Sequence, residues 1–194
     1  ADIYIKINGY VRGISIKKGI KNSVHVESVN TLITFFREIG IEEEIIRKFL
    51  YYQYADGTIN GIGKKRVSSS VYRKAHQSEI DEINKVFNDE KYINSFVNRF
   101  VLQGNKSLYE VDAIIYGVVE DFVWITKEEV YYIMRKHLKD EVASLHISLL
   151  TLQPMARNLN FNPEYEFGRN QVQVKWYALP DNIIEVMAFY RNRK

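Results

Sequence analysis

The chain contains no cysteine among its 194 residues. This absence excludes disulfides, zinc–thiolate sites, iron–sulfur clusters and thiol nucleophiles. It fits a reducing compartment, so we expect a cytoplasmic protein. No apolar run approaches the roughly 20 residues that a membrane-spanning helix needs. The sequence also lacks a glycine-rich phosphate loop followed by Lys and Ser or Thr, and it lacks a G-x-G-x-x-G pattern, so nothing supports a kinase or Rossmann function.

The composition is otherwise that of an ordinary globular domain, with 46% hydrophobic and 26% charged residues. A chain of this length can bury a full core. We therefore expect one domain over residues 1–194, with a helical insertion at about 41–105. The chain opens inside a predicted strand and without an initiator methionine, so we expect a natural N-terminal segment before it. The net charge of +3 only weakly favours a nucleic-acid partner.

Strand and helix patterns alternate irregularly, which predicts an α+β fold with a central mixed sheet flanked by helices. The opening strand is followed by Asn8-Gly9, the strongest short hairpin signal, and by a return strand over 10–17. Ser23 is the expected cap of a helix running to about Glu38. Thr126 is the expected cap of a later helix. Further helices are predicted over 42–52, 78–103 (broken near 88–89) and after residue 180, and further strands over 110–116, 122–126, 145–152 and 171–178.

The first hairpin brings an acid and an amine together. A two-residue turn pairs Ile7 with Tyr10, and the same register places Asp2 opposite Ser15. Since Ser15 and Lys17 share one face of their strand, Asp2 is expected near both. A carboxylate can hold Mg²⁺, the metal can polarise a phosphate and acidify water, and an ammonium can stabilise the transition-state charge. Asp and Lys across a hairpin also occur as a simple surface ion pair of small energetic value.

Asp2 and Ser15-Ile16-Lys17 resemble the motif of the PD-(D/E)xK nucleases. Ala1-Asp2 stands at the Pro-Asp position, and Ser15 stands where the family has a second acid. Longer stretches are similar to restriction-enzyme-like proteins, namely 14–19, 22–27, 54–58, 154–158 and 171–176. The resemblance implies a restriction-endonuclease-like core and Mg²⁺-dependent cleavage of double-stranded DNA, in the manner of a type II restriction enzyme. The alternative is a catalytically inactive DNA-binding relative, which the serine would permit.

The family sometimes moves its second carboxylate to a neighbouring helix, and the resemblance therefore points to Glu27. His25 lies about 200° around a helix from Glu27, so both reach the site only if the helix starts after His25. The expected catalytic set is Asp2, Ser15, Lys17, His25 and Glu27, with Asp2 and Glu27 as metal ligands. Glu27 in a first helical turn is equally explained by the helix dipole.

Two rival sites are visible. Asp112 and Lys127 repeat the spacing of Asp2 and Lys17. The predicted helix cap at Thr126 indicates that this repeat arises by chance. The other rival combines Glu164 or Glu166 with Gln173 and Lys175.

Basic side chains that could contact DNA phosphates are spread along the chain. Solvated basic loops would look the same in the sequence. Because symmetric double-strand cleavage usually needs two active sites, a homodimer is also expected. The expected DNA-binding residues are Lys18, Lys21, Lys64, Lys65, Arg66, Arg157 and Lys175.

Overall fold

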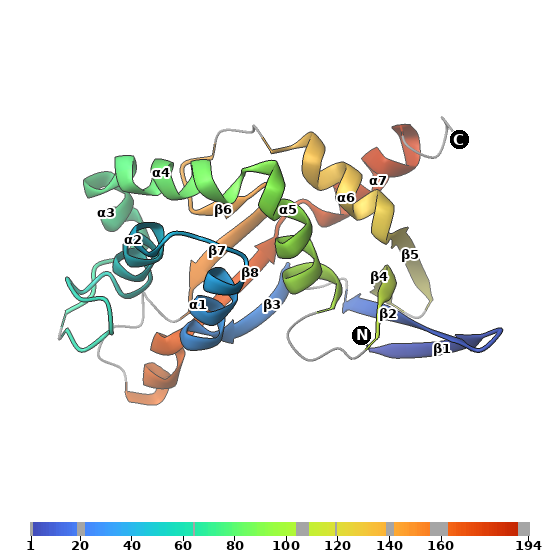
Figure 1. Ribbon diagram of the computed structural model, residues 1–194, viewed down its shortest axis with the longest axis horizontal. Helices are drawn as coiled ribbons and strands as arrows, with labels where there is room; N and C mark the ends of the chain where they lie inside the picture. The colour runs from blue at the N-terminus through green and yellow to red at the C-terminus, as the bar shows by residue number, and fades with distance from the viewer. Residues whose placement is uncertain are drawn as a thin grey trace.

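The computed structural model describes residues 2–18, 22–63, 65–103, 109–118, 120–138, 142–155 and 163–189. These residues form two four-stranded sheets, with helices packed against them (Figure 1). One sheet is mixed and the other is antiparallel. The α+β class expected from the sequence is therefore confirmed. Within the described residues, no helix is long and apolar enough to cross a membrane.

The mixed sheet has the order β1-β2-β4-β5 and carries the first hairpin. Its strands are β1 (Ile3–Ile7), β2 (Tyr10–Lys18), β4 (Val111–Val118) and β5 (Asp121–Thr126). The predicted hairpin register is confirmed, because Ile7 lies opposite Tyr10 and Ile3 lies opposite Ile14. Asn8 and Gly9 have positive φ values of 49° and 85°, as the tight primed turn requires. β2 then runs parallel to β4, so residues about 100 positions apart lie side by side.

The antiparallel sheet has the order β3-β8-β7-β6. Its strands are β3 (Ser23–Ser28), β8 (Gln171–Trp176), β7 (Leu150–Pro154) and β6 (His146–Ile147). The expected strand over 145–152 is therefore divided in two by a tight turn. Ser148 adopts a positive φ of 50° in this turn, and its Oγ donates a 2.6 Å hydrogen bond to the carbonyl oxygen of Met134.

The helix predicted from Ser23 was wrong at its start. Ser23–Ser28 forms strand β3, and helix α1 begins at Val29. Ser28 is the actual cap, since its Oγ accepts a 3.1 Å hydrogen bond from the backbone amide of Thr31. Pairing with β8 supplies a partner strand for the extended backbone of β3, a long-range interaction that a local capping pattern does not reveal.

Helices fill most of the interval between the first strands and β4. The predicted break near 88–89 is confirmed, because Asp89 caps the second piece by accepting a 3.0 Å bond from Lys91 N. The helices up to β4 are α1 (Val29–Glu38), α2 (Glu43–Tyr54), α3 (Ser69–Ala75), α4 (Gln77–Phe87), α5 (Glu90–Val97) and the π-helical turn η1 (Asn98–Leu102). The later ones are α6 (Lys127–Lys136), the 3₁₀ helix η2 (Pro163–Asn170) and α7 (Leu179–Phe189).

Aromatic side chains dominate the helical part of the core. Phe36, Phe49, Phe87 and Phe96 are all buried, and the Phe36 and Phe87 ring centroids lie 5.1 Å apart. Helix α2 also contacts β7, and η1 contacts β2, β3 and β4. Since η1 touches strands of both sheets, this end of the helical region is packed into the fold at the place where the candidate site lies.

Candidate functional site

Asp2 is held by the end of strand β2. Its Oδ2 accepts hydrogen bonds from Ser15 Oγ (3.1 Å) and from the backbone amide of Ile16 (2.6 Å). The backbone amide of Asp2 donates to the carbonyl oxygen of Ile14 at 2.9 Å. The pairing of Asp2 with Ser15 that the turn predicts is therefore present. Asp2 Oδ1 receives no hydrogen bond from any residue that the structure describes, so one carboxylate oxygen is left for another ligand.

Lys17 shares the strand face of Ser15, as alternation along β2 requires. Its Nζ donates a 3.2 Å hydrogen bond to the main-chain carbonyl of Val24, at the start of β3. Burial lowers the pKa of Lys17, and the negative charge of Asp2 only partly opposes this effect. Lys17 is thus a partly desolvated amine that interacts electrostatically with the carboxylate of Asp2.

Glu27 and His25 lie on β3, the next strand along the chain but part of the other sheet, where a two-residue spacing puts both on one face. The sequence analysis required the helix to start after His25 if both residues were to reach the site, and α1 does start after it, at Val29. His25 Nε2 lies 3.3 Å from Glu27 Oε1. Lys17 bonds the carbonyl of the residue before His25, so the two groups of predicted site residues meet at this point of β3.

The carboxylate of Glu27 is occupied by a residue that the sequence analysis missed. Arg99 donates from Nη2 to Glu27 Oε2 at 2.6 Å and from Nε to Glu27 Oε1 at 3.3 Å. The two side chains are only 13% and 2% exposed. Burial works against the ionised form of Glu27, but the bonds and charges of His25 and Arg99 outweigh it and lower the pKa of Glu27. No sequence pattern near Arg99 points to this role. In the structure, Arg99 lies in a π-helical turn, a feature often found at functional sites.

These contacts decide how the site fits a magnesium ion. Mg²⁺ commonly keeps several waters and takes one or two carboxylates together with substrate phosphates. Asp2, whose Oδ1 accepts no bond from the part of the chain that the structure describes, fits as a single carboxylate ligand. Glu27 does not fit as the second ligand in this arrangement, because Arg99 and His25 already surround its carboxylate. Across the described ranges, no group of three or more His, Cys, Asp and Glu side chains is placed to hold a metal.

The first rival site does not form. Asp112 is ion-paired with Arg12 at 3.1 Å, whereas Lys127 pairs with Glu110. Lys127 begins α6, and Thr126 is its cap as predicted, in a reciprocal capping box with Glu129. The repeated spacing therefore marks no shared site, because Asp112 and Lys127 each pair with another residue.

The second rival is divided between a helix and a strand. Glu166 belongs to η2 and makes a 3.0 Å ion pair with Arg169, and Glu164 lies in the same helix. Gln173 and Lys175 lie on β8, where they alternate with buried Val172 and Val174.

The expected DNA-binding residues divide into three groups. Arg66 is buried, being only 3% exposed, and burial lowers its pKa, so it is not the surface contact that was expected. Lys65 is exposed and Lys175 is half-buried. Lys21, Lys64, Arg157 and the side chain of Lys18 lie outside the described residues.

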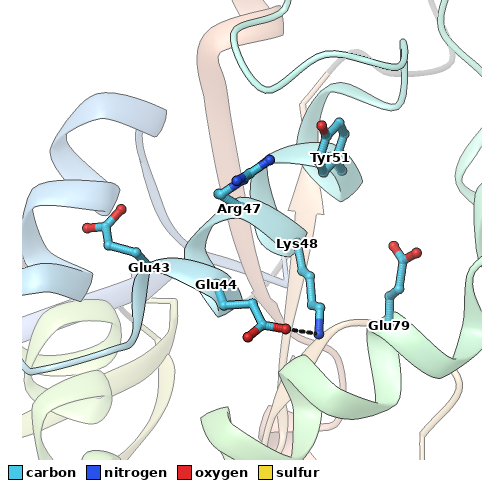
Figure 2. A pocket seen from close by; sticks show the side chains of 6 residues that line it. All are labelled: Glu43, Glu44, Arg47, Lys48, Tyr51 and Glu79. Carbon is cyan, nitrogen blue, oxygen red and sulfur yellow. Dashed lines mark hydrogen bonds and ion pairs between the residues drawn. The ribbon is translucent and has the colours of Figure 1, made fainter.

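Two pockets lie elsewhere on the surface. One pocket of about 450 Å³ lies between α2 and α4, and Figure 2 shows its charged lining. Its acids are already paired there, since Glu44 bonds Lys48 at 2.8 Å and Glu43 bonds Arg37. A second pocket, of about 460 Å³, includes Lys65. Neither pocket is lined by a residue of the predicted catalytic set.

Comparison with known proteins gives this chain no relative, because no family model and no curated protein matches it.

Proposed function

We propose that this chain is a nuclease domain that hydrolyses phosphodiester bonds of double-stranded DNA with Mg²⁺, as a type II restriction enzyme does. One observation carries the proposal. The Asp2 carboxylate and the desolvated Lys17 amine lie together on one face at the end of β2. An acid whose second oxygen has no hydrogen bond among the described residues, beside a partly buried amine, is the minimal apparatus for holding a cation and a phosphate together.

The roles follow from the contacts. Asp2 would bind the ion through Oδ1, while Ser15 and the amide of Ile16 hold Oδ2 and fix the carboxylate. The bound ion would polarise the phosphate and acidify a water molecule. Lys17 would face the phosphate oxygens, where a partly desolvated ammonium stabilises negative charge more strongly than an exposed one. Arg99 would keep Glu27 ionised but bound, so Glu27 acts by positioning β3.

A polar face of the antiparallel sheet supports DNA as the substrate. Gln153 lies opposite Gln173, and Thr151 lies opposite Lys175, while the alternate residues of β7 and β8 are buried. Glutamine amides can pair with adenine edges, and lysine binds phosphates. The face adjoins β3, whose first residues contact Lys17. We propose that DNA lies along these strands.

A plasmid-cleavage assay tests the nuclease activity. The wild type is expected to nick or linearise supercoiled DNA with Mg²⁺ and to be inactive in excess EDTA. Asp2→Asn and Lys17→Met are each expected to lower the rate by about 10²-fold or more. Lys6→Met is the matched control, because Lys6 is an exposed lysine of the same hairpin. A folded wild type that cleaves with neither Mg²⁺ nor Mn²⁺ would refute the proposal.

A second function, DNA binding without cleavage, is favoured by Ser15 at the acid position and by the ion pair of Glu27 with Arg99. A mobility-shift assay separates it from the first function. A protein that binds duplex DNA but leaves plasmid intact supports the inactive relative. Ser15→Asp then adds the missing carboxylate, and a gain of Mg²⁺-dependent cleavage would show that only the acid was lacking.

A further inference from the structure

The mixed sheet has two faces of opposite character. Alternation along the strands puts Ile114 and Ile125 on a buried face, which α6 covers and which also carries Ser15 and Lys17. The other face, here called the open face, carries the isoleucines of the hairpin and the aromatic residues of β5. Its apolar members are Ile3, Ile5, Ile7, Tyr10, Ile14, Ile16, Ile115, Phe122 and Trp124.

The open face is most exposed at its two edges, whereas Ile14 and Ile115 between them are half-buried. Tyr10 and Ile7 are 71% and 57% exposed on the hairpin, and Phe122 and Trp124 are 54% and 49% exposed on β5. A continuous apolar surface of this kind marks an interaction site, whereas single exposed hydrophobic residues do not. Among the side chains of this face that the structure describes, the basic one is Arg12, which is ion-paired with Glu110 and Asp112. Such a face suits an apolar partner rather than a phosphate backbone.

We propose that the open face packs against the open face of a second copy of this chain, to form a two-fold symmetric dimer. Apolar sheets pack face to face about 10 Å apart, and a two-fold axis makes one surface complementary to itself. The four strands contain 5, 9, 8 and 6 residues, so at about 3.3 Å per residue and about 4.8 Å between strands the face covers roughly 440 Å². Two such faces bury roughly 900 Å², close to the approximately 1,000 Å² of a specific interface, which suits a dimer of micromolar affinity.

The dimer does not depend on the proposed nuclease activity. Asp2, Ser15 and Lys17 lie on the opposite face of the sheet, so a contact through the open face does not involve them. If the chain does cleave DNA, the same symmetry would supply one site for each strand.

Tryptophan fluorescence gives a direct test, because the two tryptophans differ in exposure. Trp176 is fully buried, whereas Trp124 lies on the open face. Acrylamide quenching therefore reports mainly on Trp124. Over roughly 1–100 µM protein, sedimentation is expected to change from monomer to dimer, and quenching is expected to fall in parallel.

Two substitutions locate the interface. Phe122→Glu and Ile7→Glu are each expected to raise the dimer dissociation constant roughly tenfold or more and to restore quenching. Val71→Glu is the matched control, because Val71 is 53% exposed on α3, away from the open face, and should leave both readings unchanged. Circular dichroism checks that each variant is folded.

Three results would overturn the inference. The wild type could sediment as a monomer at every concentration with Trp124 quenched. A dimer could persist in both open-face variants, which would place the interface elsewhere. A monomer with Trp124 protected would mean that another part of the same protein covers the face.

Discussion

Lys17 Nζ donates a 3.2 Å hydrogen bond to the main-chain carbonyl of Val24 and so links the mixed sheet to the antiparallel sheet. The same amine interacts with the Asp2 carboxylate, yet burial lowers its pKa. The ammonium form therefore costs free energy in the folded state that the bond and the nearby charge do not fully recover. Residues that reduce stability are common at functional sites, where activity and stability oppose one another.

Lys17→Met is accordingly expected to leave stability at pH 7 within about 1 kcal/mol of wild type, or to raise it, while abolishing cleavage. The apolar side chain fills similar space without a charge to desolvate. Urea unfolding of both proteins measures the difference. A loss of more than about 2 kcal/mol would mean that the bond to Val24 outweighs desolvation.

The Lys17 comparison also has a pH signature. Because the folded pKa lies below the ordinary 10.5, the unfolded chain binds more protons between the two values, and stability rises with pH in that window. Wild type should therefore gain stability relative to Lys17→Met as the pH approaches 10.5. Unfolding curves at several alkaline pH values give the trend, and a constant or opposite difference would contradict the lowered pKa.

Glu27→Gln is expected to destabilise the protein by about 3 kcal/mol, because it leaves the Arg99 guanidinium buried without its counter-charge. Glu43→Gln is the control. It removes the ion pair with Arg37, in which both side chains are more than half exposed, and should change stability little because solvent screens the pair. Equal losses of stability in the two variants would show that burial does not make the Glu27–Arg99 ion pair more important than an exposed one. The double variant Glu27→Gln/Arg99→Met should recover part of the loss.

The Glu27 ion pair should also make the stability of the protein depend on pH in the acid range. His25 and Arg99 lower the pKa of Glu27 against the effect of burial, so its contribution to stability is complete above the ordinary value of 4.5. That contribution is lost as the pH falls through the lowered pKa. The stability difference between wild type and Glu27→Gln should therefore shrink as the pH falls below about 4.5. A difference that stays constant over this range would argue against the ion pair.

Thr126→Ala is expected to cost about 1 kcal/mol, because the Thr126 hydroxyl caps α6 in a reciprocal box with Glu129. Thr34→Ala provides the comparison, since Thr34 is exposed within α1 and bonds only the carbonyl of Asn30. It should change stability little. Thermal unfolding measures both. A Thr126→Ala variant as stable as the wild type would mean that the cap does not stabilise this helix.

Several parts of the fold could be predicted because their causes are local. Asn8-Gly9 determines the turn, and the turn determines which residues face each other along the hairpin, down to Asp2 and Ser15. The same holds for the cap at Thr126 and for the break before α5. In each case the signal and the structure lie within a few residues of one another.

The sequence by itself determined the α+β class, the first hairpin and the meeting of Asp2, Ser15 and Lys17, because a two-residue turn fixes the register of its strands. Only the tertiary structure decided that β3 is a strand, that Arg66 is buried and that Arg99 binds Glu27 from 72 positions away. Such contacts depend on how β2, β3 and η1 pack together. No pattern of neighbouring residues encodes them, because their free energy comes from burial and charge pairing between distant segments.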